Sequence, residues 1–180
     1  MKIAVFISGT GTNLKALLEA ERNKYFSSEI VLVVANKEAG GLDFAKAYGK
    51  ETLVSKDDDQ IIGVLKEKKV DLIVLAGFLP KLSDKILEEF VAINIHPALL
   101  PKYGGKGFYG MNVHRAVFEN REKISGATVH YVNGKLDDGD IILQREVDIS
   151  DCKDSEEVAK RVLTIEHGIL KDAIKKLEDE

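Results

Sequence analysis

DLIVLAGF, residues 71–78, is the stretch of sequence that most directly indicates the fold. From Leu72 to Ala76 it is an unbroken run of apolar residues, with no polar side chain placed to face water. Strands with one face in solvent alternate polar and apolar residues, whereas a continuous apolar run is typical of a strand that is buried on both faces. We therefore predict a strand here, in a parallel sheet that is covered by helices on both sides.

Strands and helices alternate on either side of this stretch. Further strands are predicted at 2–8, 30–35, 51–54 and 93–96, and helices at 14–21, 40–50, 57–69 and 83–90. The helix that starts near Asp57 has acids in its first turn and lysines in its last, as the helix dipole favours, and Ser83 is the expected cap of the following helix. This alternation predicts an α/β fold with a doubly wound, mostly parallel, Rossmann-like sheet.

The pattern changes after Pro101. The predicted elements there are a glycine-rich loop at 102–110, a helix at 111–121, strands at 125–132 and 140–149 around the turn-rich segment 133–139, and a long helix at 154–178. This last helix carries an apolar stripe that can pack back on the sheet. We predict a single domain, residues 1–180, in which a nucleotide-binding half, 1–100, precedes a half, 101–180, that adds a C-terminal β-hairpin and the long C-terminal helix.

The composition is typical of a globular protein and narrows the range of partners. Of 180 residues, 44% are hydrophobic and 31% are charged, and the net charge of −4 does not favour binding to nucleic acid. The apolar run near the N-terminus is too short to span a membrane and no signal-peptide pattern follows it, so we expect a cytoplasmic protein without a membrane partner. The lone Cys152 is expected to be a surface or half-buried thiol. No Cys/His cluster has the spacing of a metal site, so no metal is expected.

The first predicted strand and helix are joined by the glycine-rich loop Ser8-Gly-Thr-Gly-Thr-Asn13. Glycines allow a sharp turn, and free backbone amides at a helix start attract an anion. The dinucleotide fingerprint requires a glycine where Leu14 stands and an acid where Asn36 stands, and the Gly-Lys-Ser/Thr of a P-loop is absent. The loop therefore suits a single phosphate monoester, and a tight turn that binds no ligand is the alternative.

The strand at 93–96 ends in two polar side chains, Asn94 and His96, which share a face because strand residues alternate with a period of two. The carboxyl ends of strands line the ligand crevice of open α/β sheets, and Pro97 favours an extended His96. An amide and a protonated imidazole side by side are two hydrogen-bond donors that suit an oxygen gaining negative charge in acyl transfer. The alternative is a core histidine satisfied by a backbone carbonyl, with Asn94 capping the loop.

A carboxylate partner for His96 is expected from the segment 135–140, where Asp137 or Asp138 would favour the imidazolium and relay a proton through water. A solvated turn is the alternative, since Asp and Gly favour turns on their own account. The remaining histidines are expected to have lesser roles: His130 lines the site or packs in the core, with packing favoured, and His114 and His167 lie at the surface.

Four motifs occur in an order that resembles the folate-dependent formyltransferases over nearly the whole chain. They are SGTGTN at 8–13, AGFL at 76–79, NIHPALLPKYGG at 94–105 and LDDGDIILQ at 136–144. The third motif resembles the wider formyltransferase fold, and the first resembles the branch that acts on glycinamide ribonucleotide. The resemblance implies two small-molecule substrates, with the formyl group passing from N10-formyltetrahydrofolate, as cosubstrate, to the amine of glycinamide ribonucleotide in de novo purine synthesis. The motifs do not distinguish a monomer from a homodimer.

The resemblance also implies roles for individual positions. Asn94 and His96 match the pair that polarises the formyl oxygen, and Asp137 matches the carboxylate that raises the pKa of the imidazole. The other implied positions are Gly11, Thr12 and Asn13 for the substrate phosphate, Glu166 for its amine, and Leu79, Pro80, Lys81, Leu82, Asn94, Asn133 and Asp137 for the pterin ring of the folate.

Three departures from the family pattern affect the expected substrate sites. Leu79 and Pro80 stand where the family often has Met-Arg, so a charged group near the folate entrance is missing or supplied elsewhere. The segment between Tyr48 and Asp71 is shorter than usual, and Lys56 is the candidate there for the glutamate tail of the folate. The loop 102–110 is longer than the common form, which affects how the loop over the nucleotide is expected to close. Two alternatives stay open: a formyltransferase acting on another amine, such as a sugar nucleotide, and a non-catalytic phosphate-binding α/β module in which Asn94 and His96 are structural.

Overall fold

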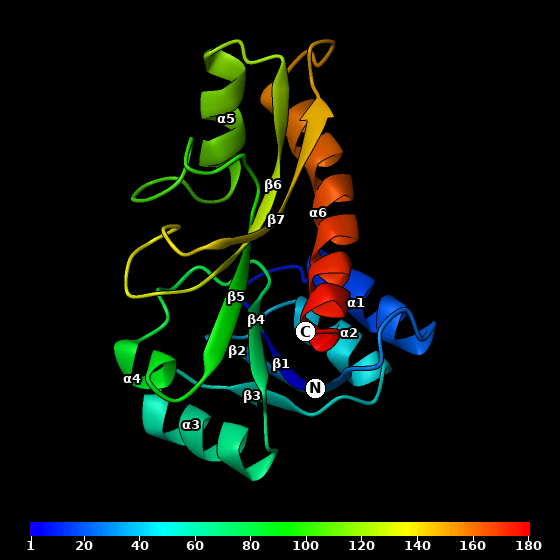
Figure 1. The fold of residues 1–180 in the computed structure, drawn as a ribbon, viewed down its shortest axis with the longest axis vertical. Helices are drawn as coiled ribbons and strands as arrows, with labels where there is room; N and C mark the ends of the chain where they lie inside the picture. The colour runs from blue at the N-terminus through cyan, green and yellow to red at the C-terminus, as the bar shows by residue number, and fades with distance from the viewer.

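The computed structural model describes residues 1–180, in which seven strands form one sheet with helices on both faces (Figure 1). The strand order is β3-β2-β1-β4-β5-β6-β7. The pairs from β3 to β5 are parallel, whereas β6 runs antiparallel to β5, and β7 antiparallel to β6. The predicted doubly wound, mostly parallel sheet with a C-terminal hairpin is confirmed, and the sheet runs through both parts of the chain, 1–100 and 101–180.

The bounds of the elements follow the predicted alternation. In chain order they are β1 (Lys2–Ile7), α1 (Thr12–Arg22), β2 (Glu29–Ala35), α2 (Gly41–Ala47), β3 (Thr52–Val54), α3 (Asp58–Glu67), β4 (Leu72–Leu75), α4 (Asp84–Leu87), β5 (Val91–His96), α5 (Met111–Glu119), β6 (Ile124–Tyr131), β7 (Ile141–Asp148) and α6 (Ser155–Glu178). Asp57 and Ser83 cap α3 and α4 by accepting hydrogen bonds from the backbone amides of Gln60 and Ile86. The shortest helix, α4, ends before the predicted residue 90.

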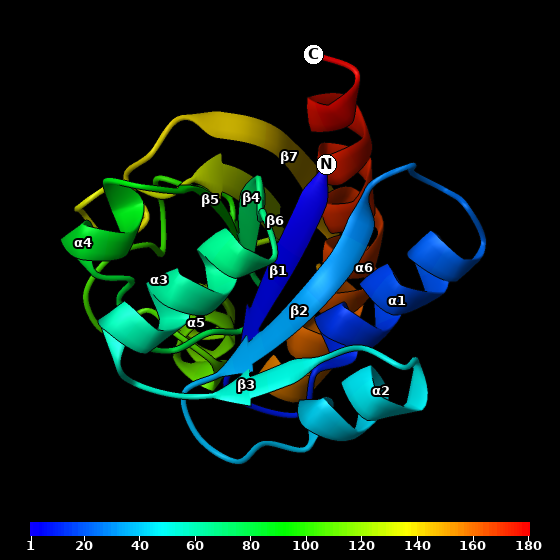
Figure 2. The ribbon, with the colours of Figure 1, turned by 90° about the horizontal axis from the view of Figure 1, so that it is seen from below.

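The two faces of the sheet are covered by different helices (Figure 2). Ile3, Val5 and Ile7 of β1 belong to the core cluster that includes residues of α1, α2 and α6, whereas Ala4 and Phe6 belong to the cluster that includes residues of α3 and α4. The four residues of β4 divide in the same alternating way and all are buried. This arrangement confirms that the apolar run at 71–78 marks a strand that is buried on both faces.

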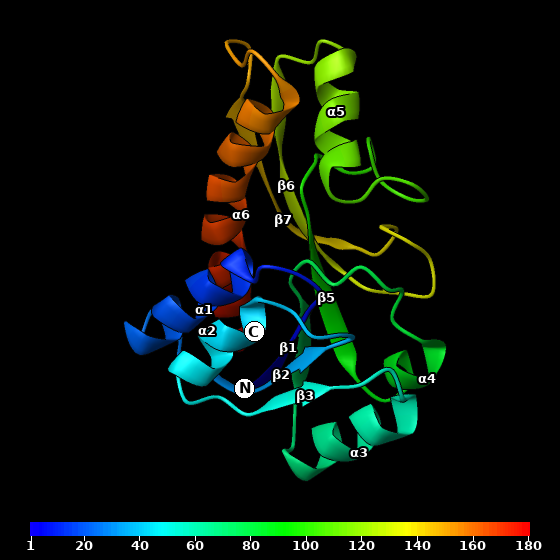
Figure 3. The ribbon, with the colours of Figure 1, turned by 180° about the vertical axis from the view of Figure 1, so that it is seen from behind.

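The long helix α6 runs from the end of the molecule that holds α5 to its middle, beside α1 (Figure 3). Its 24 residues span roughly 36 Å, since each helical residue adds about 1.5 Å. Near its start, Val158 and Val162 pack with Val113 and Val117 of α5, and near its end Ile169 and Ile174 join the cluster that contains α1. Its middle turns are therefore held beside the carboxyl end of β1. None of the helices combines the length and apolar character needed to cross a bilayer.

Gly126 lies in β6 where the backbone of β7 passes closely. A Cβ atom at this position would lie 2.1 Å from the carbonyl oxygen of Arg145 and 2.7 Å from the side chain of Leu99. We expect Gly126→Ala to lower the free energy of unfolding by about 1–3 kcal/mol, because overpacking forces the backbone to shift. Urea unfolding followed by circular dichroism measures this change.

The matched control is Gly63→Ala in α3, an exposed position. Nothing lies within 4 Å of a Cβ atom placed there. Alanine in a helix interior is expected to stabilise the protein by about 0.5–1 kcal/mol relative to glycine. An unchanged unfolding midpoint for Gly126→Ala would contradict the close packing of β6 and β7.

Candidate active site

One cavity of about 650 Å³ opens at the carboxyl ends of β1, β4 and β5. In a doubly wound sheet this edge is where ligands bind. The cavity is lined by the positions that the resemblance assigns to the reaction, the phosphate, the amine and the pterin ring: Gly11, Thr12, Asn13, Leu79, Pro80, Lys81, Leu82, Asn94, His96, Asn133, Asp137 and Glu166. Lys56, the candidate for the folate tail, does not line it, and the cationic side chains that do are Lys81, Lys135 and Lys160.

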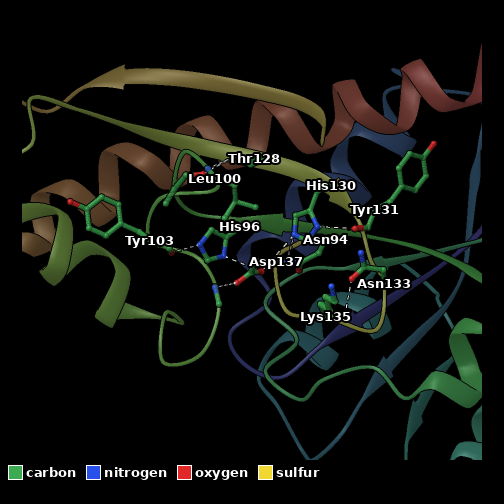
Figure 4. A network of polar contacts seen from close by, with 12 residues as sticks. Asn94, His96, Leu100, Tyr103, Thr128, His130, Tyr131, Asn133, Lys135 and Asp137 are labelled. Carbon is green, nitrogen blue, oxygen red and sulfur yellow. Dashed lines mark hydrogen bonds and ion pairs between the residues drawn. The ribbon is translucent and has the colours of Figure 1, made fainter. Parts of the chain in front are cut away.

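Asn94, His96 and Asp137 come together although they are distant in the sequence (Figure 4). Asn94 and His96 lie at the end of β5, and Asp137 lies in the connection between β6 and β7. The distance from His96 Nδ1 to Asp137 Oδ1 is 3.5 Å, and the Gly105 amide donates a 2.8 Å hydrogen bond to Asp137 Oδ2. Asp138 is exposed and makes no ion pair, so the structure selects Asp137 of the two candidate carboxylates.

The surroundings of His96 shift its pKa in opposite directions. Its Nε2 lies 2.7 Å from the carbonyl oxygen of Tyr103, which can only accept, so Nε2 carries the proton. Burial lowers the pKa of His96, and this effect exceeds the opposing influence of the Asp137 charge and of the Tyr103 carbonyl. The Asp137 carboxylate raises the pKa of the imidazole, the influence that the resemblance implies, and desolvation of the ring opposes it more strongly.

Asp137 itself is ionised. Burial raises the pKa of this carboxyl, but His130, His96 and the Gly105 amide together lower it further, so the net direction is downward. The cavity thus holds a negative charge beside the imidazole of His96. A proton arriving from a substrate meets a carboxylate that is free to accept it.

His130 belongs to the same network, and sequence reasoning underestimated it. It is 2% exposed and lies directly across the β5–β6 ladder from Asn94. Its Nδ1 donates to the Tyr131 carbonyl at 2.9 Å, and its Nε2 lies 3.1 Å from Asn94 Nδ2 and 3.7 Å from Asp137 Oδ1. His130 therefore orients the Asn94 amide with its NH₂ group toward the ring. The strand register that pairs these two residues is not visible in the sequence pattern.

The segment after His96 is held against β6 by a buried hydroxyl. Thr128 Oγ1 donates to the Ala98 carbonyl at 2.7 Å and accepts from the Leu100 amide at 3.2 Å. The Gln144 side chain donates to both Thr128 Oγ1 and the Leu100 carbonyl. These bonds satisfy the backbone where β5 ends, so His96 is presented from a rigid support.

Glu166 reaches the other side of the cavity from the middle of α6. It is 8% exposed, and its Oε1 accepts a 3.2 Å hydrogen bond from Asn13 Nδ2 in the first turn of α1. Burial raises the pKa of Glu166 to about 7, against the smaller lowering influence of Asn13. The buried Oδ1 of Asn13 has no hydrogen-bond partner. The pair therefore presents two acceptor groups that a ligand with N–H donors can satisfy.

Glu166→Gln is expected to change how stability depends on pH. In the folded state Glu166 holds its proton up to about pH 7, against an ordinary pKa of 4.5, so folding is favoured at low pH and this contribution is lost as the pH rises through 7. Relative to the Gln variant, the wild type should lose up to about 3 kcal/mol of unfolding free energy across this window. Urea unfolding of both proteins at pH 5 and pH 8 measures the difference, and parallel pH curves would contradict the burial of this carboxyl.

The two glycines of the first loop differ, because the structure requires a glycine at position 11 but not at position 9. Gly11 caps α1 with φ of 73°, and a Cβ atom there would lie 2.6 Å from the Cα atom of Gly41. Packing of α1 against α2 therefore requires it. Gly9 has nothing within 4 Å of such a Cβ atom and does not require a left-handed conformation. No side chain caps α1, so its first amides are free toward the cavity that Thr12 and Asn13 line.

Two other histidines differ from expectation. His114 of α5 was expected at the surface but is 6% exposed, lines the cavity and has an unpartnered Nδ1. Burial, with a smaller contribution from His96, lowers the pKa of His114 to about 4. His167 is half-buried, and its Nε2 has no partner. Cys152 is half-buried, within the range expected.

The chain matches the model of a protein family described as Formyl transferase over residues 1–174. It is 37% identical to the chloroplastic phosphoribosylglycinamide formyltransferase of Arabidopsis thaliana over 96% of its own length, and it spans 64% of that relative. It is 38% identical to the phosphoribosylglycinamide formyltransferase of Haemophilus influenzae, with 97% of this chain and 85% of the relative covered. The crystal structure of glycinamide ribonucleotide transformylase 1 from Symbiobacterium toebii has a TM-score of 0.89 at 32% identity, covering 97% of this chain and 86% of that one.

Proposed function

Because the chain belongs to the formyl transferase family, we propose that it transfers a formyl group from N10-formyltetrahydrofolate to the amine of glycinamide ribonucleotide, a step of purine synthesis. The observation that carries the proposal is the convergence of Asn94, His96 and Asp137 on one side of a cavity that also contains Glu166 and the start of α1. The group of Asn94, His96 and Asp137 suits acyl transfer. Glu166 suits the binding of an amine, and the start of α1 suits the binding of a phosphate.

The reaction begins with attack of the neutral substrate amine on the formyl carbon. A nitrogen–carbon bond forms and the formyl oxygen becomes an oxyanion, which the Asn94 amide and the His96 ring stabilise by hydrogen bonds. In the structure His96 Nε2 donates a hydrogen bond to the Tyr103 carbonyl. The formyl oxygen therefore competes with that carbonyl for this hydrogen bond. Asp137 accepts the amine proton directly or through water. The oxyanion then re-forms the carbonyl as the bond from carbon to N10 breaks, and N10 takes up the proton that Asp137 accepted as tetrahydrofolate leaves.

The nucleotide is proposed to lie at the α1 end of the cavity. The free amides at the start of α1 and the Thr12 hydroxyl are donors for a phosphate monoester, and Lys160 of α6 lines the same cavity as a countercharge. Glu166 holds the amine, because an N–H donor satisfies the buried carboxyl that now meets only Asn13. Binding of a cationic amine would also favour the ionised form of Glu166.

The folate is proposed to lie at the opposite mouth, between exposed apolar side chains. Leu79, Tyr109 and Leu136 come from three separate loops, line the cavity and are at least half exposed. They supply walls for a flat ring system. Lys81 and Lys135 line this part of the cavity too, and we assign them, in place of Lys56, to the carboxylates of the folate glutamate tail.

The purified protein tests this function directly. Incubation with N10-formyltetrahydrofolate and glycinamide ribonucleotide should release tetrahydrofolate, measured by absorbance, whereas an amino-sugar nucleotide should give no release. Transfer to the sugar nucleotide alone would replace the proposed substrate. Binding of the nucleotide without transfer to any amine would support the non-catalytic module instead.

A further inference from the structure

We propose that Ser8, although it belongs to the glycine-rich loop assigned to the nucleotide, is a positioning residue for the folate side of the cavity. The inference rests on the proposed function for the identity of the two substrates. It concerns residues 77–82, the segment between β4 and α4, which we call the β4–α4 loop. This loop supplies Leu79, Pro80, Lys81 and Leu82 to the cavity.

The Ser8 hydroxyl makes hydrogen bonds with two neighbours, and its only proton is engaged in one of them. Ser8 is 4% exposed and follows the last residue of β1. Its Oγ donates a 2.7 Å hydrogen bond to Asn36 Oδ1 and accepts a 3.0 Å hydrogen bond from the backbone amide of Leu79. A hydroxyl has a single proton, so none is left for a phosphate oxygen. Ser8 therefore cannot serve as a phosphate donor while this arrangement holds, unlike Thr12, which is exposed and free.

The bond to Leu79 is the only hydrogen bond that the backbone of the β4–α4 loop makes. On one side of the loop, the Ala76 amide donates to the Phe6 carbonyl, and on the other side the capping bonds of Ser83 begin. Between them, only the Leu79 amide has a partner, Ser8 Oγ. The Leu79 side chain is 60% exposed and does not anchor its own residue. The centre of the loop is thus held by one side chain from the loop that follows β1.

Side-chain packing fixes only the two ends of the loop. Phe78 packs edge-on against Phe6 with ring centroids 5.4 Å apart, and Leu82 is buried among residues that pack on α3 and α4. Loss of the Ser8 bond frees the Leu79 peptide between these two points. Because Leu79 supplies one wall of the proposed folate site, the affinity for a flat ligand at this mouth depends on that peptide staying in place.

Asn36 sets the direction of the Ser8 hydroxyl. By accepting the proton of Ser8, it leaves a lone pair of Oγ directed to the Leu79 amide. Asn36→Ala removes that acceptor, and Asn36→Asp keeps one. The two variants distinguish a role in orienting Ser8 from a general effect of changing the residue.

The experiment compares Ser8→Ala with Thr12→Ala, a hydroxyl deletion four residues later in the same loop. For Ser8→Ala we expect the KM for formyl folate to rise about five- to thirtyfold, as for loss of a buried hydrogen bond, with the KM for the nucleotide within about twofold of the wild type. Thr12→Ala should instead raise the KM for the nucleotide and leave the KM for formyl folate within about twofold of the wild type. Asn36→Ala should shift the folate KM in the same direction as Ser8→Ala, and Asn36→Asp should restore it.

A second measurement does not depend on catalysis. Hydrogen–deuterium exchange of peptides covering 77–82 should be faster in Ser8→Ala and unchanged in Thr12→Ala. A Ser8→Ala variant that raises only the nucleotide KM, or that leaves both exchange and the folate KM unchanged, would overturn the inference. Failure of the wild type to transfer a formyl group refutes the proposed function alone, because the exchange comparison still decides whether Ser8 holds the loop.

Discussion

His96→Ala should lower kcat for formyl transfer by about a hundred- to a thousandfold, the usual cost of removing one donor to a developing oxyanion. His96 is buried at the end of β5, with its Nε2 2.7 Å from the Tyr103 carbonyl oxygen and its Nδ1 3.5 Å from Asp137 Oδ1. Its loss leaves the formyl oxygen with the Asn94 amide alone. The expected change is mainly in kcat, because the donor matters most when the oxygen becomes charged.

The initial rate of tetrahydrofolate release at saturating substrates measures this effect. His167→Ala is the matched control, since His167 is half-buried, does not line the cavity and has a ring nitrogen without a partner. Its kcat should stay within about twofold of the wild type, as for substitutions away from named interactions. Near-normal turnover of a folded His96→Ala variant would remove His96 from the mechanism.

Asp137→Asn should lower kcat by about a hundred- to ten-thousandfold, the range lost when a positioned acid–base group is removed. Asparagine is the informative substitution for a structural reason. Asp137 has φ of 52°, a left-handed conformation that Asn tolerates and that strains most other residues. The amide oxygen can still accept the hydrogen bond from the Gly105 amide, so the loop keeps its place while the charge is lost.

The pKa of His96 reports whether the substitution acts through charge. The carboxylate of Asp137 raises that pKa against the larger lowering by burial, so its removal should lower the pKa of His96 further. A titration of the His96 ring followed by NMR measures the shift. Asp138→Asn, which changes the exposed neighbour, should leave both the titration and kcat unchanged. Equal losses in the two variants would assign the effect to the loop as a whole.

The sequence predicts most of the fold because the fold depends on local periodicity. The unbroken apolar run at 71–78 indicates burial on both faces, and alternate residues of β4 do pack on opposite sides. Asp57 and Ser83 mark helix starts because capping involves only residues three positions apart. The exception is α4, which is shorter than its apolar pattern suggests, since Phe90 closes a turn back to Ile86 before β5 begins.

The partners within the cavity depend on contacts that no local pattern records. Asn94 and His96 are predictable as neighbours because both lie on one strand, but Asn94 meets His130 only through the register of the antiparallel β5–β6 pair. Asp137 rather than Asp138 faces the ring because the connection between β6 and β7 adopts one particular path. His114 was expected in solvent, yet α5 buries it against the cavity.

For this protein, then, the order of residues by itself determined the alternation of strands and helices, the helix caps and the edge of the sheet where polar side chains gather. Only the tertiary structure decided the burial that lowers the pKa of His96, the choice of Asp137 and the attachment of Leu79 to Ser8. The reason is physical: periodicity and capping act over a few residues, whereas desolvation and hydrogen bonding between loops depend on which distant segments the packed sheet places side by side.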